Sequence, residues 1–266
     1  MLFYFSATGN SKCVAQALSQ ATGEAAFSIS QCRKESRFSF SATSHGERIG
    51  FVTPVYFWGL PSPVVDFLDK LQLSAPADAF VYHVLTFGTT TGQAHYQMSR
   101  LLLSKGLRLD GRYIVRMVDT WTPLFNLSDK TRCQRITDKA LPRISHIAEM
   151  VKLLEGGDFD NRKFPHILAK LYYRTYNRQR ATSHFHVDSS RCIGCGLCAT
   201  LCPEQAIEVD CKLPRWRKSQ CAACLSCLHH CPRFAIQYGC HTARHGQFVN
   251  PYANGALPSK AQAPVE

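Results

Sequence analysis

Eight cysteines in the last third of the chain stand in two runs of identical spacing. Each run reads C-x2-C-x2-C-x3-C and is followed directly by proline; the members are Cys192, Cys195, Cys198 and Cys202, then Cys221, Cys224, Cys227 and Cys231. Three closely spaced thiolates can hold three corners of an iron–sulfur cubane, while a fourth has to arrive from another direction. This spacing is a known 4Fe–4S ligand pattern, so we expect iron–sulfur chemistry in this part of the chain.

The repeat extends beyond the cysteines, because C-P-x-x-A-I recurs at the same offset of 29 residues. Such a repeat predicts two copies of one small structural unit. Structural zinc and disulfides are the alternatives. Zinc sites use C-x2-C pairs but need neither a third cysteine two residues further on nor a Cys-Pro pair, and disulfides are rare in cytosolic proteins.

The two runs resemble those of bacterial two-cluster ferredoxins, in which the fourth cysteine of each run ligates the other cluster. The resemblance implies a crossed assignment of the thiolates. One cluster would be held by Cys192, Cys195, Cys198 and Cys231, and the other by Cys202, Cys221, Cys224 and Cys227.

The first residues of the chain predict an anion-binding loop. Met1–Phe5 is a continuous apolar run typical of a buried parallel strand, and a helical pattern begins after Ser6–Ser11 (SATGNS). Backbone N–H groups and the helix dipole would face this loop. It carries no Walker lysine and no G-x-G-x-x-G, so a terminal monophosphate suits it better than a triphosphate or dinucleotide. A plain strand–helix turn without ligand is the alternative.

SATGNS is similar to the flavodoxin loop that holds the phosphate of FMN. The resemblance implies side-chain donors from four residues and backbone contacts from the other two. The donors would be Ser6, Thr8, Asn10 and Ser11, and the backbone contacts would come from Ala7 and Gly9.

Two further loops follow apolar runs that predict buried strands at 49–55 and 80–87. In the flavodoxin-like fold, loops at the carboxyl ends of successive strands meet where FMN binds. The first loop would stack Tyr56 or Trp58 on the flavin ring, and the second would offer backbone hydrogen bonds to its polar edge. The expected contacts are Tyr56, Phe57, Trp58 and Gly59, then Phe87, Gly88, Thr89 and Gly92. Simple core packing is the alternative for the aromatic loop.

The expected architecture is α/β: a flavodoxin-like, doubly wound parallel sheet in order 2-1-3-4-5, with a small α+β two-cluster ferredoxin domain. A weak second strand at 27–29, a fifth strand at 112–118 and a helix over 129–154, kinked or broken at Pro142, complete the sheet domain. The sequence does not place the loop that contains Trp121 and Phe125, whose rings would either shield the flavin or face the ferredoxin domain. The expected divisions are 1–155 for the flavin domain, 156–183 for a basic aromatic linker, 184–240 for the ferredoxin domain and 241–266 for a loosely ordered tail.

The whole chain resembles bacterial flavodoxin–ferredoxin fusion proteins. The resemblance implies two 4Fe–4S clusters and FMN, and a relay that converts between one-electron and two-electron transfer. The alternatives are an FMN-dependent reductase of a small substrate, with His83 or His95 as proton donors, and a ferredoxin with an empty flavodoxin-like docking domain. The three flavin loops contain no Asp or Glu, so we expect a less negative potential for the flavin's second reduction than in flavodoxins.

The charge and the hydropathy of the chain indicate which classes of partner it could bind and where it could be located. The formal charge of +12 falls to roughly +6 once two clusters and FMN are counted. Much of the excess lies in the linker, which predicts a solvated helix or a docking face for an acidic redox partner or an anionic membrane. No nucleic-acid motif, signal peptide or membrane-spanning segment is apparent, so we expect a cytoplasmic protein. The five remaining cysteines are interpreted as ordinary thiols, and the sequence leaves the oligomeric state open.

Overall fold

The computed structural model describes residues 1–255. Its centre is a six-stranded, all-parallel sheet in the order β2-β1-β4-β6-β7-β8. In that order the strands are Ala26–Ser28, Leu2–Tyr4, Arg48–Pro54, Phe80–Phe87, Gly111–Arg116 and Gly157–Asp158. The first five confirm the predicted order 2-1-3-4-5, and the two-residue β8 is an edge strand that the sequence did not predict.

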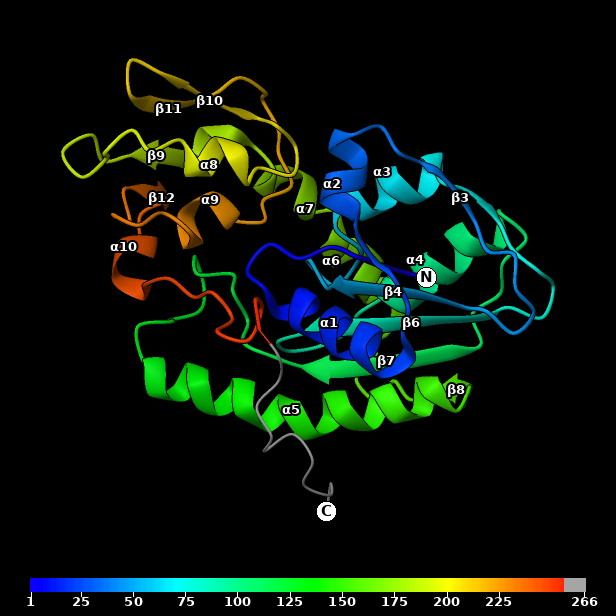
Figure 1. Ribbon diagram of the computed structural model, residues 1–266. Helices are drawn as coiled ribbons and strands as arrows, with labels where there is room; N and C mark the ends of the chain where they lie inside the picture. Colours follow the sequence, from blue (N-terminus) through cyan, green and yellow to red (C-terminus); the bar gives the residue numbers. More distant parts are fainter. Residues whose placement is uncertain (256–266) are drawn as a thin grey trace.

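Burial on both faces explains why the central strands read as apolar runs. All eight residues of β6 (FVYHVLTF) are buried, which is expected for a parallel strand covered by helices on both sides. One face carries α1 (Asn10–Thr22) and α5 (Lys130–Lys152), which lies below the sheet in Figure 1. The other face carries α2 (Ile29–Lys34), α3 (Ser62–Lys70) and α4 (Ala94–Leu103).

Two details of this region differ from expectation. Helix α5 runs unbroken through Pro142, although a kink or break was expected there. The side chain of Asp129 caps the helix by accepting the backbone N–H of Arg132 at 2.8 Å. In addition, β3 (Ser39–Ser41) and β5 (Gln72–Ser74) form a separate two-stranded parallel sheet.

The cysteine-rich region, residues 185–238, is small and built from antiparallel pairs. Strand β9 (Phe185–Val187) pairs with β12 (Ile236–Tyr238), and β10 (Ile207–Asp210) pairs with β11 (Leu213–Trp216). Its two short helices are α8 (Leu197–Thr200) and α9 (Ser226–His229), and they occupy equivalent positions in the two sequence repeats. The observed fold is thus the predicted flavodoxin-like sheet with a small α+β region beside it.

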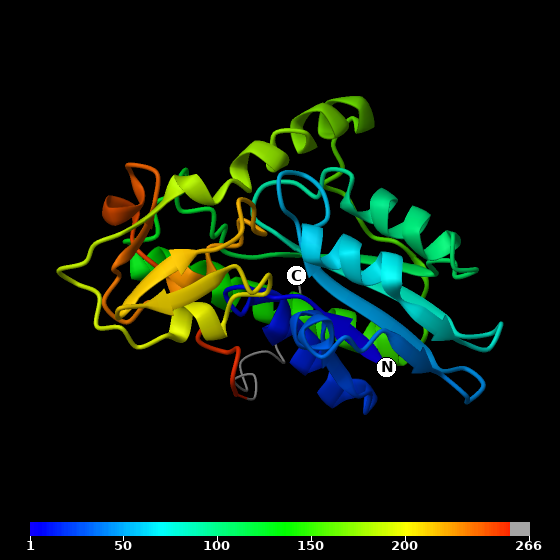
Figure 2. The same ribbon diagram turned by 90° about the horizontal axis from the view of Figure 1, so that it is seen from above.

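Two connecting segments join these parts. The linker continues from β8 through α6 (His166–Tyr173), α7 (Tyr176–Gln179) and the 3-10 turn Thr182–His184. Figure 2 shows this yellow-green segment running along the outside of the molecule from one part to the other. After β12 the chain forms α10 (Thr242–His245) and returns to the sheet region. The expected loose tail is therefore packed over residues 241–255, and its remainder lies outside the described residues.

Candidate functional site

A cavity of about 350 Å³ lies at the carboxyl ends of β1, β4, β6 and β7. All three predicted loops reach it, as expected for parallel strands whose carboxyl ends share one edge of a sheet. The predicted residues that line it are Ser6, Ala7, Thr8, Asn10, Ser11, Tyr56, Phe57, Trp58, Phe87, Gly88 and Thr89. The predicted glycines that do not are Gly9, Gly59 and Gly92.

Polar side chains of the Ser6–Ser11 loop form hydrogen bonds within the loop and to neighbouring parts of the sheet region. Ser6 Oγ accepts the N–H of Gly9 at 3.1 Å, and the hydroxyls of Ser11 and Thr86 are 2.8 Å apart. Asn10 Nδ2 donates to the carbonyl oxygen of Val118 at 3.0 Å. Asn10 and Ser11 thus fasten the loop to the sheet. The first N–H groups of α1, which have no intrahelical partner, are the donors that point to an anion.

The returning tail covers the outer side of this loop. The N–H of Asn250 donates to the Thr8 carbonyl oxygen at 2.8 Å, and Asn250 Nδ2 donates to Asn10 Oδ1 at 3.0 Å. Gly9 has φ +94°, and a Cβ there would lie 2.6 Å from that of Ala253. Upstream, Gln247 Nε2 donates to the carbonyl oxygen of Cys231 at 2.9 Å. The tail therefore ties the cysteine-rich region to the anion loop.

Aromatic rings form one wall of the cavity. Phe57 and Trp58 occupy the two central positions of a tight turn closed by mutual backbone hydrogen bonds between Tyr56 and Gly59. Both have positive φ, 49° and 65°, a conformation that Asn and Gly usually supply. Packing holds them there: the ring centroids of Trp58 and Tyr172 are 4.2 Å apart. Tyr56 is half-buried, and the loss of solvation around its hydroxyl raises its pKa well above the usual value.

The loop after β7, which the sequence left unplaced, closes another side. Trp121 and Phe125 both line the cavity, and Trp121 also packs against Tyr238 of the cysteine-rich region at 5.2 Å. Asp119 lines the cavity too, and burial raises the pKa of its carboxyl. Asp119 lies outside the three predicted loops, which contain no acidic residue, and it is a carboxyl that the expectation about the flavin potential did not take into account.

Neither histidine proposed as a proton donor reaches the cavity. His83 is buried in β6, with its Nε2 2.8 Å from the hydroxyl of Thr53, and the Nδ1 atoms of His83 and His95 are 3.0 Å apart. Burial lowers the pKa of both rings, to about 3 for His95. Both are therefore neutral core residues near pH 7.

The eight motif cysteines line two small cavities in sets of four. The set that we call the exposed set has one exposed and three half-buried members: Cys192, Cys195, Cys198 and Cys231. The set that we call the buried set has three buried members and the half-buried Cys224: Cys202, Cys221, Cys224 and Cys227. These are the two sets that the ferredoxin resemblance implies. Among residues 1–255 no group of three or more His, Cys, Asp or Glu side chains is placed to hold a single metal ion.

The surroundings of the thiols fit iron–sulfur ligation. The N–H of Ala206 donates to Cys202 Sγ at 3.3 Å, and the N–H of Ala235 donates to Cys231 Sγ at 3.2 Å. The two alanines are equivalent positions of the repeat, so both copies make the same N–H···S bond, a type that influences cluster potentials. Cys224 is shared between two sites, because it lines both the small cavity of the buried set and the large cavity.

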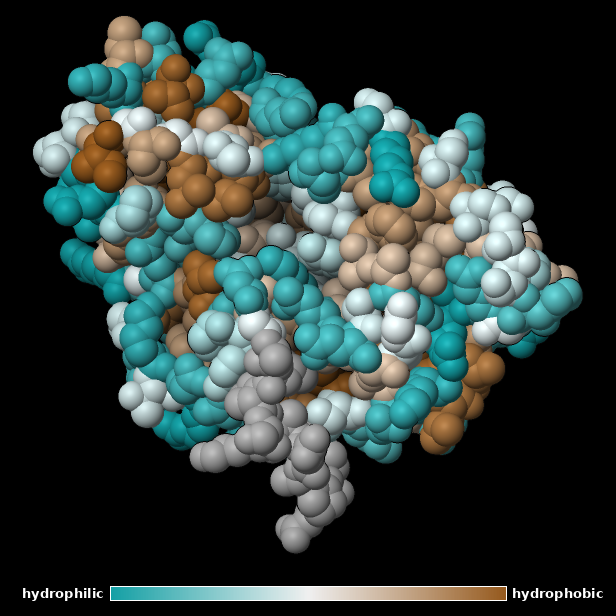
Figure 3. All heavy atoms as spheres, in the orientation of Figure 1, coloured by the Kyte–Doolittle hydropathy of each residue, from teal (hydrophilic) through white to brown (hydrophobic). Residues whose placement is uncertain are grey.

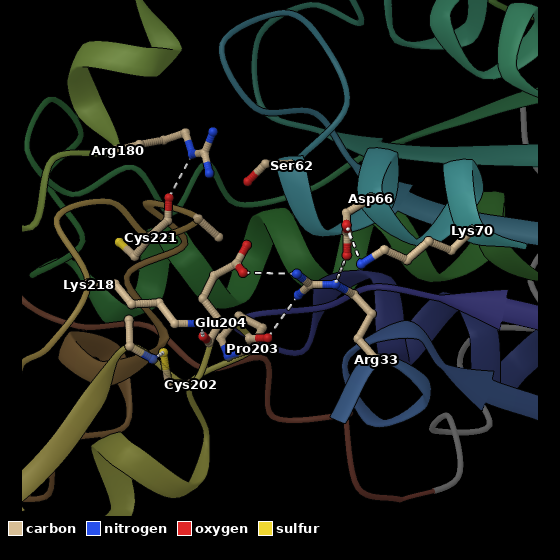
Figure 4. Close-up of polar contacts among 12 residues, drawn as sticks. Arg33, Ser62, Asp66, Lys70, Arg180, Cys202, Pro203, Glu204, Lys218 and Cys221 are labelled. Carbon is tan, nitrogen blue, oxygen red and sulfur yellow. Dashed lines mark hydrogen bonds and ion pairs between the residues drawn. The ribbon is translucent and has the colours of Figure 1, made fainter. Parts of the chain in front are cut away.

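Cationic side chains fix the buried set against the sheet region (Figure 4). Arg33 of α2 donates to Asp66 at 2.8 Å, to Glu204 at 2.9 Å and to the carbonyl oxygen of Pro203 at 2.9 Å. Arg180 Nε donates to the carbonyl oxygen of Cys221 at 2.8 Å. We call the Arg33–Asp66–Glu204 group the arginine clasp. Sequence reasoning missed it because Arg33 and Glu204 lie 171 positions apart.

Comparison with known proteins assigns both parts. A flavodoxin domain model matches residues 1–140, and a 4Fe-4S binding domain model matches residues 185–208. No curated protein matches the chain.

Three solved structures illustrate the similarity. The Trp repressor binding protein from Bacillus subtilis is 12% identical and has a TM-score of 0.35, covering 58% of this chain and 97% of its own. The azoreductase from Bacillus anthracis str. Sterne is 9% identical with a TM-score of 0.35, covering 55% and 97%. The rubredoxin oxygen:oxidoreductase from Desulfovibrio gigas is 15% identical with a TM-score of 0.33, covering 57% and 36%.

The family matches agree with the two parts of the fold described above. They support FMN and at least one 4Fe–4S cluster as the cofactors of an iron–sulfur flavoprotein in electron transfer. The flavodoxin domain model matches more than half of this chain. The chain therefore belongs to the flavodoxin domain family, here fused to a 4Fe–4S ferredoxin domain.

Proposed function

We propose that the protein relays electrons between a partner protein and FMN through two 4Fe–4S clusters, in the order exposed set, buried set, flavin. The observation that carries this order is Cys224, which lines both the cavity of the buried set and the large cavity. A cluster on the buried set would then lie beside the flavin. When bound, FMN accepts one or two electrons, whereas each cluster carries one, so the chain would convert between the two kinds of transfer.

The large cavity supports FMN as its ligand. Its volume lies in the range of small-molecule sites, and it joins an anion loop at one end to an aromatic wall. Donors from the start of α1 would hold the phosphate, and the Phe57–Trp58 turn and Trp121 would flank the flavin ring. The Phe87–Thr89 backbone would face the ring's polar edge.

The exposed set supports electron exchange with a partner. Cys195 is exposed, and apolar side chains surround it, with 61% of the surface of Ile193 and 40% of that of Val209 accessible. Figure 3 shows apolar surface over this part of the molecule, at the upper left. Arg215 and Arg217 are paired with Asp210 and Glu208. The further cations of this face are Arg191, Lys212 and Arg233, which favour an acidic partner.

The experiment compares Cys195→Ala with Cys224→Ala in anaerobically reconstituted protein. The native chain should hold about eight iron, about eight sulfide and one FMN, and each variant about half the iron. With a reduced acidic ferredoxin as donor, Cys195→Ala should slow reduction of the whole chain. Cys224→Ala should let the remaining cluster reduce while the flavin stays oxidised.

Direct photoreduction of the flavin is the control, because it bypasses the clusters and should remain unchanged in both variants. Equal, native rates of flavin reduction by the ferredoxin in both variants would refute the proposed order. Failure of the native chain to bind FMN would indicate a docking domain instead. We propose a cytoplasmic location for this chemistry, because the thiolates that hold iron–sulfur clusters must stay reduced.

A further inference from the structure

Helix α6 turns large apolar side chains toward solvent. Ile167 is 75% exposed, and Leu168 and Leu171 are each 51% exposed. Phe164, just before the helix, and Tyr172 are more than a third exposed. Three aliphatic side chains at positions i, i+1 and i+4 of one short helix form a contiguous apolar face, unlike the single exposed leucines found on most proteins.

The charges within the segment that carries this face are all positive. Residues 161–187 contain six Lys or Arg and no Asp or Glu. Lys163 is paired with Asp158 at 2.7 Å. The cations that remain exposed along the segment are Arg162, Lys170, Arg174 and Arg178.

The opposite side of α6 is fixed to the protein. Ala169 is fully buried, Tyr172 packs on Trp58, and the Tyr173 hydroxyl donates to the carbonyl oxygen of Leu60 at 2.6 Å. In α7, Tyr176 donates to the carbonyl oxygen of Ala222 at 2.7 Å. Figure 2 shows the segment at the periphery of the molecule, and among residues 1–255 no helix or strand is drawn over its outer side. The apolar face is therefore held outward by specific contacts.

We propose that this face, which we call the α6 face, binds the surface of an anionic lipid bilayer. An anionic bilayer attracts a protein by burial of apolar side chains and by its negative charge. The apolar side chains of this face would enter the acyl boundary, and the exposed Lys and Arg beside them would meet the anionic headgroups. An acidic protein partner would need an apolar patch of its own to cover Ile and Leu, whereas an anionic bilayer offers charged headgroups and acyl chains on every part of its surface. No helix in residues 1–255 is long and apolar enough to cross a membrane, so the contact is peripheral.

The binding places the large cavity close to the bilayer. Tyr172 belongs to the same helix as Ile167 and Leu171, yet its ring lines the cavity. Leu171 and Tyr172 are adjacent in the helix, so the lipid-facing side chains lie beside the cavity wall. The proposal itself rests on the surface alone and stands or falls independently of the electron relay.

The test measures binding of the reconstituted protein to vesicles by co-sedimentation at low salt. Vesicles of phosphatidylglycerol and phosphatidylcholine should bind it, and vesicles of phosphatidylcholine alone should bind it at least about tenfold more weakly. Ile167→Ser/Leu171→Ser should weaken binding to the anionic vesicles by about tenfold or more. The matched control is Leu103→Ser/Leu153→Ser, two leucines that are 67% and 65% exposed elsewhere and should leave binding unchanged.

A second pair of variants separates the site from the overall charge. Lys170→Glu/Arg174→Glu and Arg135→Glu/Lys139→Glu change the net charge equally, but only the first lies on the α6 face. The first should reduce vesicle binding much more than the second. Equal losses, no binding by the native chain, or α6-dependent dimerisation in ultracentrifugation without vesicles would each overturn the proposal, the last by assigning the face to a second copy of the chain.

Discussion

Residues 1–158 and the cysteine-rich region enclose cores of different kinds. The sheet region has an apolar core on each face, with twenty buried residues in each. The cysteine-rich region has one core of ten buried residues, three of which are the motif cysteines Cys202, Cys221 and Cys227. The first region can bury enough apolar surface to fold without a cofactor, whereas in the second the proposed clusters would occupy the place of a core.

The largest effect expected from this difference follows removal of iron. Without clusters, amides of the cysteine-rich region should exchange hydrogen as in an unfolded chain, because four thiols per cavity would leave two holes in a small core. Amides of β4 and β6 should stay protected. Hydrogen exchange with mass spectrometry of the iron-free and reconstituted protein measures both. Native protection of residues 185–238 in the iron-free chain would show that their core does not depend on clusters.

The arginine clasp tests how firmly the two regions are joined. Arg33→Ala leaves Glu204, whose side chain is 13% exposed, without its partner. The cost should be roughly 2–3 kcal/mol, below that of a fully buried pair because Asp66 is 37% exposed. Tm should fall by about 4–12 °C in calorimetry of the reconstituted protein. Lys70→Ala, which removes an exposed partner of Asp66, should lower Tm by no more than about 2 °C; equal shifts would contradict a buried clasp.

The sheet region should also respond to acid through its buried histidines. The folded state lowers the pKa of His95 to about 3, so the unfolded state binds more protons between about pH 3 and 6.5. Stability is therefore complete above pH 6.5 and declines as the pH falls, by about 1.4 kcal/mol at pH 5.5 from His95 alone.

Calorimetry at pH 7 and 5.5 measures this effect. The native chain should lose Tm between the two values, and His95→Gln should lose less, whatever its Tm at pH 7. An identical loss in both would mean that His95 does not titrate on unfolding.

The smallest effect should come from Asp119 in the cavity. Asp119→Asn removes a carboxyl whose pKa is raised by burial. The variant keeps a side-chain oxygen that can accept the backbone N–H of Trp121. Because burial disfavours the ionised carboxylate of Asp119, the native protein loses stability as the pH rises above the usual pKa of an aspartate. The Asp119→Asn variant should therefore be at least as stable as the native protein at pH 7. A neutral side chain should make the potential of the flavin's second reduction less negative in a redox titration. Asp69→Asn, far from the cavity, is the control; identical potentials for all three proteins would remove Asp119 from the flavin's electrostatics.

Patterns of neighbouring residues were sufficient to predict the buried strands and the loops that follow them. The apolar runs at 1–5, 49–55 and 80–87 became buried parallel strands, and their loops converge because parallel strands share an edge. The short β8 carries no periodicity that could have revealed it. Asp119 and Trp121 follow the last predicted strand in a loop without a motif, so only the fold could bring them to the cavity.

The contacts between segments far apart in the sequence could not be predicted from the sequence. Arg33 and Glu204 or Thr8 and Asn250 have no signal in a single sequence, because each pair depends on how two separately folded parts meet. The contacts of Asn10 and Ser11 with the sheet are a further example, and their expected role as phosphate donors stays a prediction. Their side chains bond to Val118 and Thr86, a role that neighbouring residues in the sequence do not indicate.

The tail over the anion loop has a consequence for biosynthesis. A ribosome releases the loop at Ser6–Ser11 first and its cover at Asn250 and Ala253 last, with the whole cysteine-rich region made in between. A nascent or truncated chain thus presents an uncovered loop, and the pocket acquires its outer wall only after the cysteine ligands exist. If FMN occupies the pocket as proposed, the order of synthesis would make its secure retention a late event in the maturation of the protein.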